Sequence, residues 1–197
     1  MEHHNLGDNM RVRQFILPGL ISVGLVLLPG APTRGNERAT ETATFGDGCF
    51  WGVEAAFRQV KGVTDTVVGY MGGTLKHPTY DQVSTHRTGC SEVCQVTYDP
   101  TRVSYEKLVD VFFQTHHPEF YCGSNADGLG RYGSAIYFHN AEQEKTALAV
   151  KDSLQASGKF DRPITTAIIP AMQFKPAEEY HQRYAEKHHL ANCPITP

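Results

Sequence analysis

The sequence predicts a two-layer α+β domain in which helices pack against a mainly antiparallel or mixed sheet. Helix and strand signals are mixed in an irregular order along the chain. The strand signals are rich in Val, Thr and Tyr and are bounded by Gly and Pro. From residue 43 onwards there is no repeat, low-complexity tract or long linker, so a single domain is expected within the 197 residues.

The first forty residues differ from the rest. The basic run Met10-Arg11-Val12-Arg13 leads into an apolar stretch, Phe15 to Leu28, and then into Pro29-Gly30-Ala31. As a helix this stretch would span about 21 Å, short of a hydrocarbon core of about 30 Å. The order fits a secretory signal peptide, although an uncleaved anchor and a buried helix of the mature fold are open alternatives. We expect a signal peptide or N-terminal tail over 1–42 and an extracytoplasmic domain over 43–197, periplasmic or secreted and either released or membrane-tethered.

A helix is predicted directly after Cys49, because apolar residues recur there at helical spacing until Lys61-Gly62. Strands are predicted over 63–70 and 91–98. The segment between them, 71–89, is expected to be a loop. The strand order cannot be derived from these signals.

The next helix is expected to begin after Ser104, which can act as its N-cap, and to end near His116-His117-Pro118. A glycine-rich loop follows to Gly133. Residues 134–138 then read as a short strand.

Asn140 and Gln143 resemble a capping box for a helix that extends to about Ala156. A last strand is expected over 165–170. Pro176 suits the first turn of a final helix. That helix would carry on one face Tyr180, Tyr184 and His188.

Charge and composition exclude several classes of partner. The formal net charge is -3, the pI is near 6.3 and there is no block of Lys or Arg, so nothing indicates binding to nucleic acid or to a membrane surface. The ten His residues are scattered apart from three adjacent pairs, none of which has helix-face ligand spacing. We expect a monomer with small or neutral partners.

The chain has five cysteines, an odd number that suggests at least one thiol kept for chemistry in an exported protein. Cys49 is the cysteine predicted at a helix start, where backbone N–H groups and the helix dipole favour the thiolate. A buried, inert cysteine beside two aromatic residues is the alternative. The other four are Cys90, Cys94, Cys122 and Cys193.

Cys90 and Cys94 are expected on one strand. Four residues of strand separate them by about 13 Å, too far for a disulfide. At this spacing on a strand the two thiols point the same way but do not converge, so they do not form half of a zinc site. Strand alternation does place both on one face with Glu92.

Beyond these features the chain carries a series of motif blocks. They are Gly48-Cys49-Phe50-Trp51-Gly52-Val53-Glu54, Gly69-Tyr70-x-Gly72-Gly73, Pro78-Thr79-Tyr80, Thr88-Gly89-x-x-Glu92-x-x-x-Val96-x-Tyr98-Asp99-Pro100, Tyr132-x-Ser134-Ala135-Ile136-Tyr137, Ile164-Thr165-Thr166 and Phe174-x-x-Ala177-Glu178-x-x-His181-Gln182-x-Tyr184. Together they resemble the A-type peptide methionine sulfoxide reductases. The resemblance covers Ala43 to about Cys193.

This resemblance implies an enzyme that reduces the S epimer of methionine sulfoxide, free or in proteins, to methionine. It also implies that no metal or organic cofactor is needed and that a thioredoxin-like dithiol is the reductant. A ferredoxin-like plait with additions is the implied form of the α+β fold.

The family's roles fall on matching positions. Cys49 would attack the sulfoxide sulfur as a thiolate. Phe50 and Trp51 would wall a slot for the substrate's S-methyl group, although ordinary core packing also explains aromatic residues. Glu92 would protonate the departing oxygen, because a carboxyl group shielded from water can stay protonated as a general acid requires.

The remaining roles lie further along the chain. Tyr80 and Tyr132 match phenols that hydrogen-bond the sulfoxide oxygen, and Asp127 matches the acidic group that orients the polar end of the site. Cys193 matches the resolving thiol, which would condense with the sulfenic acid formed on the nucleophile; a stray terminal cysteine is the alternative.

Some positions depart from the family pattern. Asp47 stands where a glycine usually precedes Gly48-Cys49, and its negative charge works against thiolate formation. Cys90 replaces a histidine and Cys94 an aliphatic residue.

The loop that carries Asp127 also departs, with Cys122-Gly123-Ser124-Asn125-Ala126 and Leu129-Gly130-Arg131 in place of the usual runs. We hypothesise that Cys90, Cys94 or Cys122 can trap oxidised Cys49 when Cys193 is absent.

Two other classes of function are weighed beside the enzyme. One is a binding or redox-sensing protein that kept the fold and lost turnover, which the intact Cys49 and Glu92 argue against. The other is an exported metal-binding module that uses Cys90, Cys94 and histidines, which rests on composition alone.

Overall fold

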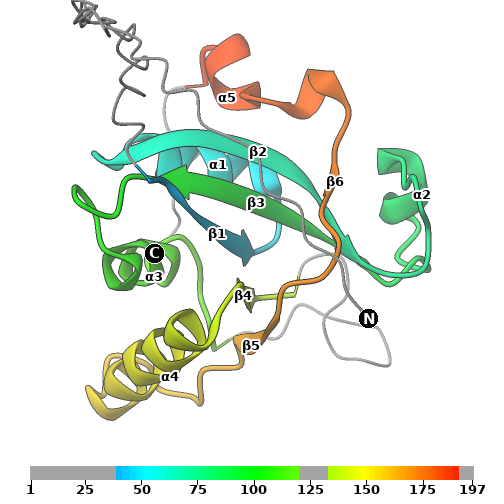
Figure 1. Ribbon diagram of the computed structural model, residues 1–197. Helices are drawn as coiled ribbons and strands as arrows, with labels where there is room; N and C mark the ends of the chain where they lie inside the picture. The colour runs from blue at the N-terminus through cyan, green and yellow to red at the C-terminus, as the bar shows by residue number, and fades with distance from the viewer. Residues whose placement is uncertain (1–38, 120–132, 191–197) are drawn as a thin grey trace, which may run out of the picture. The chain divides into compact units, whose positions relative to one another are not determined.

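A six-stranded sheet of order β5-β4-β1-β3-β2-β6 forms the centre of the fold (Figure 1). The computed structural model describes residues 39–119 and 133–190. The pairs β1·β3, β1·β4, β2·β3 and β2·β6 are antiparallel, whereas β4·β5 is parallel. The predicted α+β class with a mixed sheet is therefore confirmed; the ferredoxin-like description stays a prediction.

Three long antiparallel strands make the middle of the sheet: β1 (Glu41–Gly46), β2 (Val63–Gly72) and β3 (Cys90–Tyr98). The predicted strands 63–70 and 91–98 are thus confirmed, with slightly longer bounds. β1 was not predicted, although it lies between β3 and β4 and its last four residues are buried. It begins just ahead of the predicted domain boundary at residue 43.

Three helices begin where the sequence predicts, after Cys49, Ser104 and Asn140, and a further one begins after Thr79. They are α1 (Phe50–Arg58), α2 (Tyr80–Ser84), α3 (Tyr105–Phe112) and α4 (Ala141–Ala156). Side-chain oxygens of Thr79, Ser104 and Asn140 accept the N–H three residues on at the starts of α2, α3 and α4.

Helix α2 lies inside the segment predicted as a loop, so that prediction was wrong in part. Thr79 and Gln82 form a reciprocal capping box, in which Gln82 donates its N–H to Thr79 Oγ1 and Thr79 donates its N–H to Gln82 Oε1. A helix of five residues is too short to show a hydrophobic period in the sequence. Only its capping residues indicate it.

The predicted final helix from Pro176 is wrong. Pro176 ends a two-residue strand, β6 (Lys175–Pro176), which follows β4 (Ala135–Phe138) and β5 (Ala167–Pro170) along the chain and pairs with β2 at the other edge of the sheet. The chain then makes a 3₁₀ turn, η1 (Glu179–His181), and the one-turn helix α5 (Tyr184–Lys187).

A left-handed residue breaks the run between η1 and α5. Arg183 has a φ of 53°, and its backbone N–H donates to Glu54 Oε2 at 2.8 Å. Before it, the Gln182 side chain bonds both the N–H and the C=O of Val68, each at 2.9 Å. These bonds hold residues 174–183, which we call the strap, along β2. A continuous helix would not allow them.

The two faces of the sheet are covered differently (Figure 1). Helices α1, α3 and α4 bury one face, where Phe45 of β1 stacks on Phe57 at 4.7 Å and on Phe112 at 5.2 Å between ring centroids. The segment between β5 and β6 crosses the other face and packs Phe174 beside Met71 and its neighbours. The helical face, in which Cys90 and Cys94 lie, is the side on which the site forms.

Among the described residues, no helix is long and apolar enough to cross a membrane. The apolar stretch Phe15 to Leu28 lies outside those residues. The predicted signal peptide and the domain boundary at residue 43 therefore stay predictions.

Replacing Gly69 by Ala tests how closely the strap approaches β2. A Cβ at this position would lie 2.5 Å from the Lys175 oxygen and 2.6 Å from the Phe174 ring. We expect the free energy of unfolding to fall by about 1 to 3 kcal/mol, as measured by urea denaturation, because backbone atoms must move apart. Gly158→Ala is the control, since its φ is +70° but nothing lies within 4 Å, and it should cost about 1 kcal/mol. Equal losses in the two variants would contradict the close contact.

Candidate active site

Cys49 lies where β1 turns into α1. Gly48 before it has a φ of +55°, and Cys49 itself is the exposed N-cap of the nine-residue helix α1. The structure thus places the thiol at a helix start, as the sequence predicts. Backbone N–H groups without helical partners surround such a position, and they stabilise a thiolate there.

Glu92 reaches the same helix start from the sheet. It lies on β3 with 1% of its surface exposed, and its Oε2 accepts the backbone N–H of Phe50 at 3.2 Å. The contact uses one of the N–H groups that a helix leaves unpaired at its first turn. It therefore ties the residue after the thiol to a buried carboxyl group.

Phe50 and Trp51 form an aromatic layer beside Cys49. Phe50 is buried, with its ring centroid 5.9 Å from that of Tyr70 and 5.1 Å from that of His181. The Trp51 ring stacks on that of Tyr184, with 3.7 Å between the ring centroids and 5° between the ring planes. The two rings therefore lie face to face, and they pack Trp51 against the segment that carries Tyr184.

His181 connects this layer to the strap. The Trp51 indole N–H donates to His181 Nδ1 at 3.0 Å, and His181 is 1% exposed. Since an indole nitrogen only donates, Nδ1 accepts and the imidazole hydrogen lies on Nε2 when the ring is neutral. The Tyr80 ring lies next to the same imidazole, 4.5 Å away between centroids.

Glu178 fixes the position of Tyr80. Its Oε1 accepts the Tyr80 N–H at 2.8 Å, and its Oε2 accepts the Tyr70 hydroxyl at 3.0 Å. Burial alone would raise the pKa of Glu178, but these bonds and one from its own backbone outweigh it and hold the pKa below its usual value. A carboxylate on the strap thus joins α2 to β2.

Glu54 makes the corresponding contact from α1. This carboxyl is 1% exposed and accepts the Thr66 hydroxyl at 3.0 Å as well as the Arg183 N–H. Burial raises the pKa of Glu54, although both hydrogen bonds and the Arg58 charge oppose the rise. The helix that carries Cys49 is thereby fastened to the strap.

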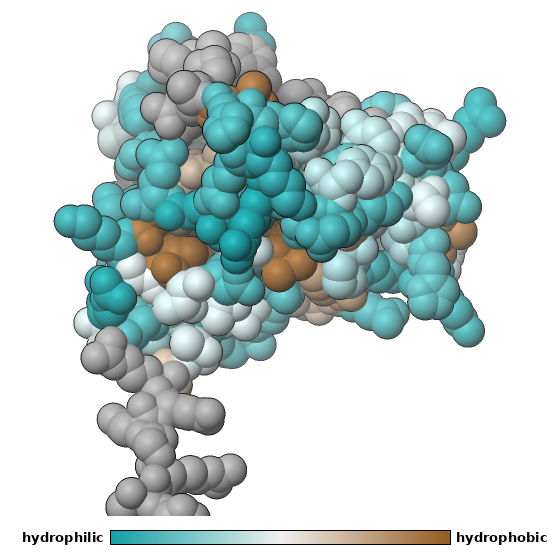
Figure 2. All heavy atoms as spheres, turned by 90° about the horizontal axis from the view of Figure 1, so that it is seen from above, coloured by the Kyte–Doolittle hydropathy of each residue, from teal (hydrophilic) through white to brown (hydrophobic). Residues whose placement is uncertain are grey.

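Surface ion pairs add little to this attachment. The face over α5 is mainly hydrophilic, with hydrophobic colour confined to small areas (Figure 2). Arg183 lies 3.5 Å from Asp65 and Lys187 lies 3.1 Å from Glu179, and these four side chains are between 42% and 89% exposed. Exposed pairs of this kind contribute between zero and about 1 kcal/mol. The buried and partly buried bonds of Glu54, Glu178 and Gln182 therefore hold the strap.

The structure brings together Cys49, Phe50, Trp51, Tyr80 and Glu92 of the predicted site. The other predicted residues lie outside the described part of the chain: Asp127, Tyr132, Cys193 and the unusual Cys122.

Cys90 and Cys94 are buried on the helical face of β3, with 2% and 0% exposure. The Cys90 thiol donates to the Gly72 carbonyl at 3.3 Å. Burial raises the pKa of the Cys94 thiol well above its usual value. Either thiol would need a local opening of the core to react with oxidised Cys49. Within residues 39–119 and 133–190, no three His, Cys, Asp or Glu side chains gather as metal ligands do.

The strap residues Glu178, His181 and Gln182 belong to the motif blocks, but their structural role could not be predicted from the sequence. The signal was a cluster of polar residues on a segment whose period suggested a helix. Their partners, Tyr70 and Val68, lie more than a hundred residues earlier, and only the fold brings them close.

A sequence profile described as peptide methionine sulfoxide reductase matches residues 41–197. The chain belongs to this family. It is 53% identical over 157 residues to the peptide methionine sulfoxide reductase MsrA of Methanoculleus marisnigri, which covers 80% of this chain and 96% of that relative.

Solved structures agree with this family membership. The reduced form of Mxr1 from Saccharomyces cerevisiae is similar with a TM-score of 0.69 and 31% identity, over 79% of this chain and 90% of that one. Mxr1 in complex with Trx2 is similar with a TM-score of 0.53 and 26% identity, over 76% and 88% of the two chains. The resemblance inferred from the motif blocks is thus confirmed.

Tyr70→Phe tests the bond that anchors Glu178. The variant loses a hydrogen bond to a charged carboxylate, and we expect the free energy of unfolding near neutral pH to fall by about 1 to 2 kcal/mol. A carboxyl whose pKa is lowered by folding adds stability above its unfolded pKa and loses it as the pH falls. The loss measured by urea denaturation should therefore shrink at acidic pH.

Tyr180→Phe is the matched control, because Tyr180 is 56% exposed. It should change the stability little at either pH. Equal losses in the two variants would count against the anchoring role of the Tyr70 hydroxyl.

Proposed function

We propose that this family member reduces the S epimer of methionine sulfoxide, free or in proteins, with Cys49 as the nucleophile. The observation that carries the proposal is the exposed Cys49 at the start of α1, with the buried Glu92 carboxyl bonded to the next residue. A nucleophile and a proton donor at one helix start are what reduction of a sulfoxide requires.

The first step transfers oxygen. The Cys49 thiolate attacks the sulfoxide sulfur while Glu92 gives a proton to the oxygen. The oxygen ends on Cys49 as a sulfenic acid, and methionine leaves. The substrate gains two electrons and the cysteine sulfur loses them, so the step balances without a metal or organic cofactor.

The aromatic layer would select the substrate. Phe50 and Trp51 form apolar surface beside the thiol, which suits the S-methyl group. Tyr80, held by Glu178, lies on the same side and would hydrogen-bond the oxygen. We assign Tyr132 and Asp127 to the same polar end of the site on the family motif alone.

The second step restores the thiol. A resolving thiol, which we assign to Cys193, attacks the Cys49 sulfenic acid, so that a disulfide forms and water leaves. A thioredoxin-like dithiol then reduces the disulfide by exchange. The similarity to Mxr1, solved in complex with Trx2, supports a partner of this kind.

Cys49→Ser should abolish methionine release from the S sulfoxide with dithiothreitol as reductant. A hydroxyl is a far weaker nucleophile than a thiolate at neutral pH. The parent should leave the R sulfoxide unchanged, as measured by chromatography of released methionine. Cys193→Ser is the companion variant and should keep the first turnover, because its thiol enters only afterwards. Turnover by Cys49→Ser, or equal use of both epimers by the parent, would contradict the proposal.

We also propose that residues 1–42 direct the domain out of the cytoplasm. The basic run, short apolar stretch and small residues in that order support it. Mass mapping of the N-terminus of protein recovered from an extracytoplasmic fraction should find a start between Ala31 and Thr44. A start at Met1 or Met10 would contradict cleavage. An exported enzyme would need a supply of thiols that crosses the membrane.

A further inference from the structure

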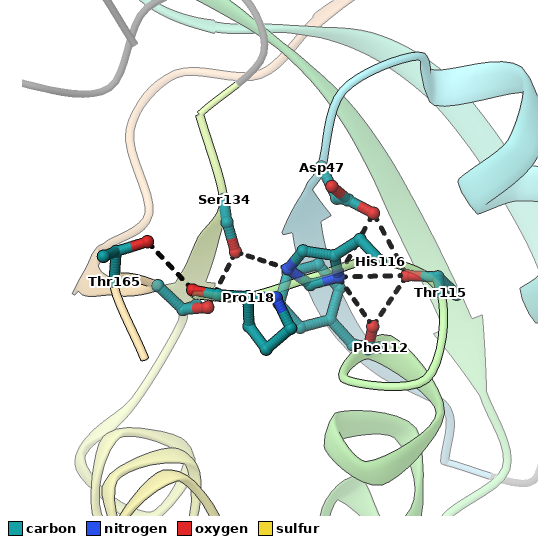
Figure 3. Close-up of polar contacts among 8 residues, drawn as sticks. Asp47, Phe112, Thr115, His116, Pro118, Ser134 and Thr165 are labelled. Atoms are coloured by element: carbon teal, nitrogen blue, oxygen red, sulfur yellow. Dashed lines mark hydrogen bonds and ion pairs between the residues drawn. The ribbon is translucent and has the colours of Figure 1, made fainter. Parts of the chain in front are cut away.

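Asp47 is the one residue of the turn Gly46 to Gly48 that carries a side chain. Its carboxyl points toward the end of α3 (Figure 3). His116 Nδ1 and Thr115 Oγ1 each lie 3.2 Å from Asp47 Oδ2. The Asp47 side chain is 15% exposed and that of His116 is 10% exposed, so water shields this contact only weakly.

The imidazole of His116 is oriented by partners on both sides. Its Nδ1 lies 3.1 Å from the Phe112 carbonyl, which only accepts, so Nδ1 carries the hydrogen. Its Nε2 lies 2.7 Å from Ser134 Oγ, and Ser134 Oγ lies 2.7 Å from Thr166 Oγ1. The hydroxyl of Ser134 therefore donates to His116 and accepts from Thr166. We call these four residues, Asp47, His116, Ser134 and Thr166, the His116 cluster.

In the His116 cluster a neutral imidazole lies beside a carboxyl group that ionises at a higher pH than usual. Burial raises the pKa of Asp47 to about 6, against the opposing bond from Thr115. Burial also lowers the pKa of His116 to about 4, although the Phe112 carbonyl and Glu119 oppose this. At neutral pH a neutral ring thus lies 3.2 Å from a carboxylate, with its Nδ1 hydrogen directed to the Phe112 carbonyl, so the ring supplies no cation to cancel the charge.

Other groups around the pair do not supply that cation. Of the described titratable groups, Glu119 and His117 follow α3 and act on His116, while Glu92 reaches the helix start from β3. Ser134 and Thr166, which face the imidazole from the β4 and β5 side, are uncharged. Among residues 39–119 and 133–190, no cation pairs with the Asp47 carboxylate, which lies two residues before the thiol.

We propose that Asp47, bonded by Thr115 and packed against His116, is a positioning residue that sets how readily Cys49 becomes a thiolate. Ionised Asp47 opposes the thiolate that the helix start favours, whereas protonated Asp47 does not. The reactivity of Cys49 consequently rises less steeply with pH across the titration of Asp47. The proposal rests on the proposed role of Cys49 as the nucleophile.

The test is the rate at which iodoacetamide alkylates Cys49 in the full chain between acidic and alkaline pH, read by peptide mass mapping. Mapping by peptide separates Cys49 from the other thiols. Asp47→Asn keeps an oxygen that can accept from Thr115 and removes the charge. Its profile should shift to lower pH by about half a unit or more and lose the shallow region of the parent near the Asp47 titration. Asp161→Asn, at an exposed position, removes the same charge elsewhere and should leave the profile unchanged.

His116→Ala removes the ring that shields Asp47 from water and should also move the profile. His116→Asn, which keeps a donor near the place of Nδ1, should restore the parent profile and serves if the alanine variant does not fold. Superimposable profiles for the parent and Asp47→Asn, or equal shifts for Asp47→Asn and Asp161→Asn, would overturn the proposal. So would variants whose melting temperature falls while the profile stays the same. Alkylation reports on the thiol whether or not a sulfoxide is reduced, so failure of the proposed function would be seen separately.

Discussion

The hydrogen bond from the Phe50 N–H to Glu92 is the contact on which the site depends. It joins the first turn of α1 to the central strand β3, so the thiol and the carboxyl group cannot move independently. Because Glu92 is buried, the bond is made away from water, where losing it would leave the Phe50 N–H without compensation. The sheet therefore helps to set the geometry of the helix start.

Carboxyl groups recur at each junction around this contact. Glu54 fastens α1 to the strap at Arg183, and Glu178 fastens the strap to Tyr80 and Tyr70. Each accepts from backbone N–H groups that no helix or sheet ladder uses, which satisfies buried polar groups at segment ends. Asp47 adds a further carboxyl on the other side of Cys49. The thiol thus lies between two anchors, one from β3 and one from the end of α3.

The sequence predicts much of this fold because its signals are local. Ser104 and Asn140 mark helix starts by their side-chain oxygens, and the strands 63–70 and 91–98 stand out by composition. Helix α2 is missed because five residues carry no hydrophobic period. The final helix is predicted wrongly because the bonds of Gln182 and Arg183 to distant partners override the local period.

The site follows the same division. Cys49 is predictable as a reactive thiol from its place before a helix, and Glu92 and Tyr80 enter through their motif blocks. Asp47 stands out in the sequence as an added charge, but nothing local pairs it with His116, which lies at the end of α3. Such pairings arise only when the sheet brings both segments to one edge.

The central claim is that Glu92 both holds the helix start and gives the proton, and Glu92→Gln separates these two roles. The amide oxygen can still accept the Phe50 N–H, but the side chain can no longer act as an acid. With saturating dithiothreitol, the account predicts that methionine release from the S sulfoxide falls by about 10² to 10⁴-fold while alkylation of Cys49 is retained. Release at the rate of the parent would contradict it.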